Sequence, residues 1–167
     1  MRPSIALFLF LFCSAAWGDR LTVPAHPKWQ EECGSCHVAY PPQLLTADNW
    51  QRLMQKLDKH FGANAGLEPQ EVQDISAFLQ RHAGRGSRYS ADSLRITDTA
   101  WFRHEHDEVS SKTWSDPAVK SRANCTACHV KAEQGDWSER SIRVPGGRGG
   151  EDGDDDDDEG DDDYEDD

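Results

Sequence analysis

The sequence has little methionine, only one long apolar run and no surplus of positive charge. Of its 167 residues, 18 are Lys or Arg and 31 are Asp or Glu, so that the net charge is −13. No nucleic-acid partner is expected. After the first 18 residues, no run is long and apolar enough to cross a bilayer, so we expect no stable membrane insertion. No segment alternates between apolar and polar residues with period two, which is the pattern typical of half-buried strands.

The single long apolar run lies at the N-terminus. Arg2 is followed by apolar residues from Ile5 to Cys13 and then by Ala16-Trp17-Gly18, a pattern typical of a signal-peptide cleavage site. The run is too short for a permanent membrane helix. We therefore predict a signal peptide over residues 1–18 and a mature chain that begins near Asp19 in the periplasm, an oxidising compartment.

Four of the five cysteines occur in two C-x-x-C-H motifs, Cys33-Gly34-Ser35-Cys36-His37 and Cys125-Thr126-Ala127-Cys128-His129. This motif is typical of covalent c-type haem attachment. Two thiols three residues apart on one helical turn can each add to a haem vinyl group, and the following imidazole then binds the iron. We predict two covalently bound haem c groups, attached at Cys33, Cys36, Cys125 and Cys128, with His37 and His129 as the proximal iron ligands.

Other uses of four cysteines fit less well. Zinc ribbons place their Cys pairs about 15–20 residues apart, whereas 88 residues lie between Cys36 and Cys125. A thioredoxin-like redox pair or a plain disulfide does not require a His after its second Cys. If Cys13 leaves with the signal peptide, haem attachment uses every remaining thiol.

The second axial ligand of each iron has six candidates. Methionine is the common choice in small cytochromes c, but Met54 is the single Met of the predicted mature chain, and it lies on the apolar face of a predicted helix. A core role is therefore favoured for it. The histidine candidates are His26, His60, His82, His104 and His106. The spacing favours His60, because its helix presents an apolar face to the nearest haem, and does not decide between His104 and His106.

Periodicity predicts two helices between the motifs. Apolar residues at helical spacing run from Trp50 to Phe61 and are closed by Gly62, and a second helix begins near Pro69 and continues to Leu79. Glu68 and Glu71 are expected to stabilise the start of this second helix, because acidic side chains interact favourably with the positive end of the helix dipole. Residues 84–93 are polar and irregular, and residues 101–106 show no helical or strand period. We predict a mostly α fold, a small dihaem cytochrome c built from short helices and loops around its haems.

The charge divides the chain. Of the 17 residues from Glu151 to Asp167, 14 are acidic, whereas the preceding residues are nearly balanced. We predict a dihaem domain over residues 19–145, as one unit or as two lobes over 19–85 and 86–145. Its own apolar core is modest, so the haems supply much of the apolar centre. Residues 146–167 are predicted to be a Gly-rich linker and a disordered acidic tail.

Further short segments accompany the two motifs in a specific order. They are residues 32–42, Leu44-Leu45, Trp50, residues 60–65, residues 95–97, Trp101-Phe102, His106, residues 124–129 and residues 135–140. Together they resemble the bacterial periplasmic dihaem cytochrome c (DHC) family. The resemblance implies two histidine ligands on each iron and places the distal ones at His60 and His106. His26, His82 and His104 fall outside the pattern, Trp137 stands where the family has Phe, and the acidic tail is an addition.

The resemblance also implies a function. It implies an electron carrier rather than an enzyme, with a membrane cytochrome b as donor and a high-spin monohaem cytochrome c as acceptor. The sequence leaves two alternatives open: the electron-delivering small subunit of a periplasmic reductase, and a haem enzyme such as a peroxidase or an oxygen or nitrogen-oxide reductase. An enzyme requires an open iron and an acid–base group, for which His104 or Glu105 is the candidate.

Overall fold

The computed structural model describes residues 21–146, which form short helices joined by loops, with no sheet among them. The α-helices are α1 (Pro27–Gly34), α2 (Ala47–Met54), α3 (Pro69–Arg81), α4 (Ala100–Glu105) and α5 (Ser111–Trp114), and 3-10 helices lie at Pro42–Leu44, Leu57–Lys59, Ser87–Tyr89, Ile96–Asp98, Cys125–Ala127, Ala132–Gln134 and Glu139–Ser141. The predicted mostly α class is confirmed. None of the helices in this part of the chain is long and apolar enough to cross a membrane. The predicted signal peptide and all but the first residue of the predicted tail lie outside the described residues.

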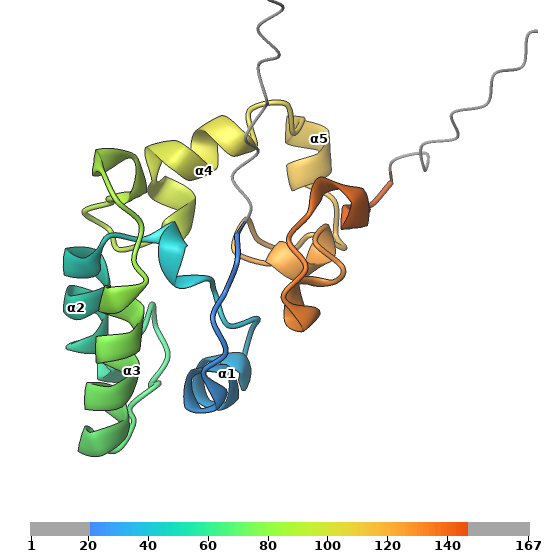
Figure 1. The fold of residues 1–167 in the computed structure, drawn as a ribbon. Helices are drawn as coiled ribbons and strands as arrows, with labels where there is room; N and C mark the ends of the chain where they lie inside the picture. Colours follow the sequence, from blue (N-terminus) through green and yellow to red (C-terminus); the bar gives the residue numbers. More distant parts are fainter. Residues whose placement is uncertain (1–20, 147–167) are drawn as a thin grey trace, which may run out of the picture.

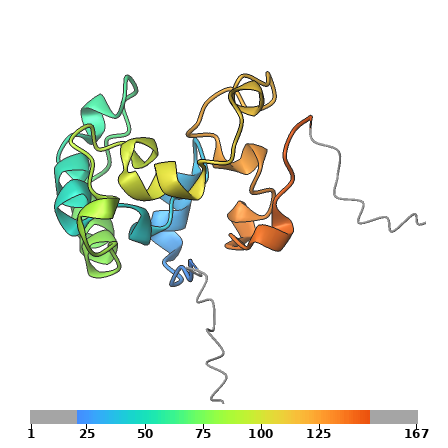
Figure 2. The ribbon, with the colours of Figure 1, turned by 90° about the horizontal axis from the view of Figure 1, so that it is seen from above.

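The main apolar core lies between α2 and α3, which run side by side (Figures 1 and 2). Leu53 and Met54 of α2 meet Ile75 and Leu79 of α3, and α1 adds Trp29 to the same cluster. Met54 is only 5% exposed there. It therefore has the core role that its sequence position predicts.

α2 is shorter than the sequence predicts. The apolar pattern predicts one helix through Phe61, but α2 ends at Met54 and a separate 3-10 turn follows at Leu57–Lys59. The Leu57 carbonyl, which would accept the Phe61 amide in a continuous α-helix, instead accepts the Ala65 amide at 2.8 Å. Phe61 has a φ of 50° and is 45% exposed, so it does not share the buried face. His60 follows directly after the 3-10 turn.

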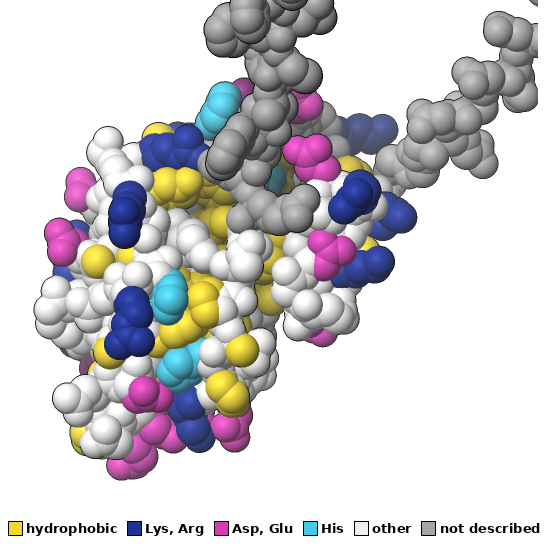
Figure 3. Space-filling model, viewed as in Figure 1, with side chains coloured by type: hydrophobic (Ala, Val, Ile, Leu, Met, Phe, Trp, Pro, Cys, Tyr) yellow, Lys and Arg dark blue, Asp and Glu magenta, His cyan; other side chains and the backbone are white. Residues whose placement is uncertain are grey.

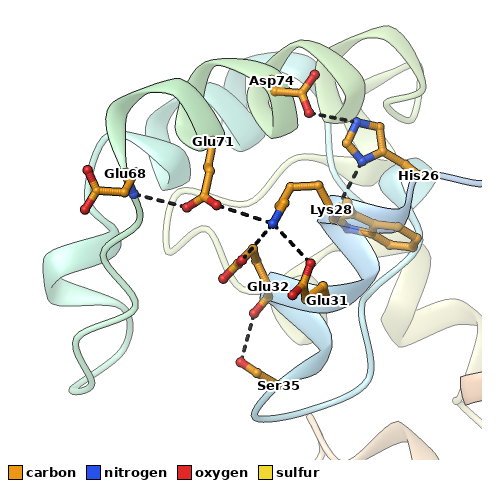
Figure 4. Close-up of polar contacts among 9 residues, drawn as sticks. His26, Lys28, Glu31, Glu32, Ser35, Glu68, Glu71 and Asp74 are labelled. Carbon is orange, nitrogen blue, oxygen red and sulfur yellow. Dashed lines mark hydrogen bonds and ion pairs between the residues drawn. The ribbon is translucent and has the colours of Figure 1, made fainter.

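α3 begins at Pro69 as predicted, and polar side chains join its first turns to α1 (Figure 4). The Glu68 amide donates to the Glu71 carboxylate at 3.3 Å. Glu71 also lies 3.5 Å from the Lys28 ammonium, and His26 lies 3.4 Å from Asp74. These pairs are partly exposed, so they contribute little stability and mainly set how α1 lies against α3.

The C-terminal third has much less core. α4 buries Trp101 and Phe102 against Leu44, but in residues 115–146 the buried apolar side chains are only Val119 and Ala132. Residues 119–146 lie on the opposite side of the molecule from α2 and α3 in both views (Figures 1 and 2). The two C-x-x-C-H motifs therefore stand in regions of very different apolar packing.

Candidate functional site

The first C-x-x-C-H motif straddles the end of α1. Cys33 lies in the last turn of the helix, and Cys36 and His37 follow beyond its end. Burial, with a smaller effect from Glu32, raises the pKa of the Cys33 thiol to about 11. His37 Nδ1 lies 2.8 Å from the Val38 carbonyl, and because a carbonyl only accepts, Nδ1 carries the proton. The other ring nitrogen, Nε2, is then the one left to bind a metal.

The second motif forms a tight turn. A 3-10 helix spans Cys125–Ala127, and the His129 amide donates to the Cys125 carbonyl at 2.8 Å. Burial raises the pKa of the Cys125 thiol to about 11. The Nδ1 atom of His129 is buried and has no hydrogen-bond partner among the described residues. Its ring lies 5.4 Å from that of Trp137, centroid to centroid, so the aromatic ring at this position contacts the motif.

Each motif histidine faces one of the two histidines that the resemblance singles out. The ring centroids of His37 and His60 are 6.2 Å apart, and so are those of His106 and His129. Two imidazoles that bind opposite sides of one metal ion through nitrogens about 2 Å from it have centroids roughly 6 Å apart. The ring planes differ by 23° in the first pair and 68° in the second. The pairs thus share one separation and differ in orientation.

In each pair, burial of one histidine favours the neutral imidazole. Burial lowers the pKa of His60, with further effects from His37 and Arg95. Burial also lowers the pKa of His129, with a further effect from His106. Neutral imidazole is the form that binds metals, so the direction of both shifts favours metal binding by His60 and His129.

α4 holds the ring of His106, although the sequence offered no period for this helix. His106 follows the last residue of α4, and its Nδ1 donates to the Phe102 carbonyl at 2.9 Å. Its ring stacks on Phe102 with centroids 4.1 Å apart and planes 20° apart. A hydrogen bond to the non-ligating nitrogen is the usual way in which proteins orient a metal-binding histidine.

The three remaining histidines have local roles. His26 is the N-cap of α1, where its Nδ1 accepts the Trp29 amide at 3.0 Å. His82 is the C-cap of α3 and packs its ring on Phe78. The side chain of His104 is 77% exposed and lies 3.9 Å from Asp107.

Both motifs line one pocket of about 530 Å³. Tyr40 also lines it, with its ring stacked on His37 and its hydroxyl donating to the Ala123 carbonyl at 2.6 Å. Burial, with a smaller effect from Cys125, raises the pKa of the Tyr40 phenol well above its usual value. Sequence reasoning missed this contact between the two motif regions, because no local pattern reports a pair 83 residues apart. Figure 3 shows apolar and histidine side chains along the middle of one face, with most charged side chains toward its edges.

The donor set fits two c-type haems. Each motif offers two unpaired thiols for thioether bonds, and each is accompanied by two imidazoles at the separation of axial ligands. The iron would supply one-electron chemistry, and the surrounding residues would set its ligands and burial.

Comparison with known proteins agrees with this chemistry. The family described as dihaem cytochrome c (DHC) matches residues 29–137. The crystal structure of a dihaem cytochrome c from Shewanella baltica OS155 is similar to this chain with a TM-score of 0.64 and 38% identity, covering 74% of this chain and 96% of that one. A structure of DHC purified from Rhodobacter sphaeroides has a TM-score of 0.60 and 38% identity, covering 68% of this chain and 98% of that one. The search of curated proteins returned no match.

The family match over residues 29–137 contains both motifs and all four paired histidines. At this identity and coverage the likeness extends beyond the fold to the family itself. The chain therefore belongs to the dihaem cytochrome c family and carries two haem c groups.

Proposed function

We propose that this protein is a periplasmic electron carrier in which each haem iron has two histidine ligands. Family membership implies haem-based electron transfer. In the proposal, Cys33 and Cys36 hold the first haem and Cys125 and Cys128 the second. His37 and His60 bind the first iron, and His129 and His106 bind the second.

The observation that carries the proposal is the equal ring separation of 6.2 Å in both histidine pairs. Two filled axial positions on each iron favour electron transfer, because catalysis at the iron needs an open position. His104 gives little support to the enzyme alternative, since its side chain is mostly exposed and lies beside Asp107 rather than in either pair. Ligation without methionine favours lower reduction potentials than the Met/His ligation of small cytochromes c.

We expect the native ferric protein to be wholly low-spin and the reduced protein to leave carbon monoxide unbound. The ferric EPR spectrum should contain two different low-spin signals, because the ring planes cross at 23° in one pair and 68° in the other. When the two imidazole planes are nearly parallel, their effects on the iron d orbitals add and separate two of these orbitals in energy. When the planes are nearly perpendicular, the effects largely cancel, and the maximum g value is larger. A high-spin signal from half of the iron, or rapid carbon monoxide binding, would contradict the proposal.

We further propose a membrane cytochrome b as electron donor and a high-spin monohaem cytochrome c as acceptor. The family relation supports this choice of partners, and the predicted signal peptide supports export to the periplasm. Reduction of the purified protein by donor-containing membranes, followed by transfer to the monohaem acceptor, tests both partners. No reduction by such membranes would argue against the donor.

The acidic C-terminal segment is predicted to raise the rate of encounter with a basic partner. Truncation after Pro145 should leave the haem spectra and potentials unchanged, because no Cys or His follows His129. Electron transfer to a cationic partner should slow several-fold at low salt and converge with the native rate as the screening length falls to about 8 Å. The measurement is stopped-flow reduction at several ionic strengths. If the native and truncated proteins transferred electrons at equal rates at low salt, only a role in solubility would remain for the segment.

A further inference from the structure

We infer that Tyr40 is a positioning residue that holds the two haem sites in a fixed relation and thereby sets the rate of electron exchange between them. The inference rests on the axial ligands proposed above. It adds a role for a side chain that neither binds iron nor forms a thioether bond. Two contacts of Tyr40, one with each motif region, carry it.

The first contact restrains the proximal histidine of the first site. The rings of Tyr40 and His37 stack, with centroids 4.6 Å apart and planes 18° apart. On another edge of the imidazole, Nδ1 donates to the Val38 carbonyl at 2.8 Å. The hydrogen bond and the stacked face together restrict rotation of the imidazole ring, so its orientation toward a bound iron would be fixed.

The second contact reaches the attachment loop of the other site. The Tyr40 hydroxyl donates to the carbonyl of Ala123, two residues before Cys125, at 2.6 Å. The other hydrogen bonds of this loop stay within the C-terminal region: the Ala123 amide donates to Ser121 Oγ at 3.1 Å, the Asn124 side chain to the Val119 carbonyl at 3.0 Å, and the Arg143 amide to the Cys128 carbonyl at 2.9 Å. The bond from Tyr40 therefore ties the second attachment loop to a distant part of the chain.

The part of the chain that contains Tyr40 is rigid. Tyr40 packs against both apolar clusters, the one between α2 and α3 and the one around Trp101 and Phe102. Pro41 and Pro42 follow it and are buried, and their rings restrict the backbone. In contrast, the loop that it holds belongs to the region with little apolar packing of its own. Because Tyr40 is held rigidly and the loop around Cys125 is weakly packed, the hydrogen bond between them is expected to fix the separation of the two sites.

The consequence concerns the rate of exchange. Electron exchange between two centres falls off exponentially with their separation, so small movements of one site change it strongly. Both motifs and Tyr40 line the same pocket, and Tyr40 contacts His37 of the first motif and the Ala123 carbonyl near the second. Releasing the loop around Cys125 should broaden the range of separations and slow the average exchange.

The test compares Tyr40→Phe with the native protein. The Phe ring keeps the stacking on His37 and loses only the hydroxyl that reaches Ala123. We expect unchanged low-spin g values at both irons, a broader iron–iron distance distribution by pulsed dipolar EPR, and several-fold slower exchange after flash reduction. Tyr40→Leu also removes the stacking, so it should in addition shift the g values of the haem at Cys33 and Cys36.

Tyr89→Phe is the matched control. The Tyr89 ring lies against Trp101 and its hydroxyl accepts from Arg88, so this change removes a phenol oxygen without touching either motif. It should leave both measurements at their native values. An unchanged distance distribution and exchange rate in Tyr40→Phe would overturn the inference. The native EPR spectrum tests the ligand assignment separately, because it is recorded before any change at Tyr40.

Discussion

We expect His106→Ala to convert one of the two haems to a high-spin form that binds carbon monoxide, and His60→Ala to do the same to the other. Alanine offers no donor atom, and each of these imidazoles stands 6.2 Å from its motif histidine, the separation of axial ligands. Half of the haem absorbance should respond in each variant. Added imidazole should restore the low-spin spectrum by filling the vacated position.

EPR identifies which haem has changed. His106→Ala should remove the signal of the pair whose planes cross at 68°, and His60→Ala the signal of the pair at 23°. His82→Ala and His104→Ala are the controls, because His82 packs on Phe78 and His104 is exposed beside Asp107. A spin change in either control, with none in His60→Ala or His106→Ala, would show that the ligands had been assigned to the wrong histidines.

The second large effect is expected from loss of the second haem. In Cys125→Ser/Cys128→Ser we expect residues 115–146 to lose their ordered structure, while α2 and α3 remain folded. Ordering each backbone residue costs about 1–2 kcal/mol, and burial of an aliphatic side chain such as Val119 contributes roughly 2 kcal/mol. Val119 and Ala132 are the buried apolar side chains of this region, so its own packing falls far short of the cost.

Limited proteolysis with mass mapping measures this effect. Trypsin should cut the variant rapidly after Arg122, Lys131 and Arg140, which lie in the affected region. The reciprocal variant Cys33→Ser/Cys36→Ser should keep most of its helix content, because the cluster between α2 and α3 does not depend on the first motif alone. Thr126→Ser, which preserves the second motif, is the matched control. Native-like protection of residues 115–146 without the second haem would contradict the prediction.

Local signals in the sequence account for the elements that were predicted correctly. α3 has thirteen residues, a Pro in its first turn and acidic residues at its start, so its period and its boundary were both readable. α4 has six residues, too few to show a period, and only the structure assigns it. The sequence predicted a longer α2 than the structure has. The Leu57 carbonyl accepts the Ala65 amide instead of the Phe61 amide, and no local sequence pattern indicates that hydrogen bond.

The candidate site divides in the same way. The motif for covalent haem attachment consists of five consecutive residues, so both C-x-x-C-H motifs and their histidines could be identified from the sequence alone. Spacing already favoured His60, whereas the assignment of His106 needed the resemblance, because spacing left His104 and His106 equivalent. The structure separates these two: the ring of His106 packs on Phe102 and faces His129, whereas the ring of His104 points to Asp107.

The sequence by itself determined that the chain has two haem attachment motifs, a mostly helical body and too little methionine for Met ligation of both irons. These are properties of composition and of residues close together along the chain. Only the tertiary structure decided which imidazoles face each other, at what angle, and that Tyr40 reaches from one motif region to the other. Such relations arise when packing brings distant segments together: α1 meets α3, and His106 at the end of α4 meets His129, only once the chain has folded.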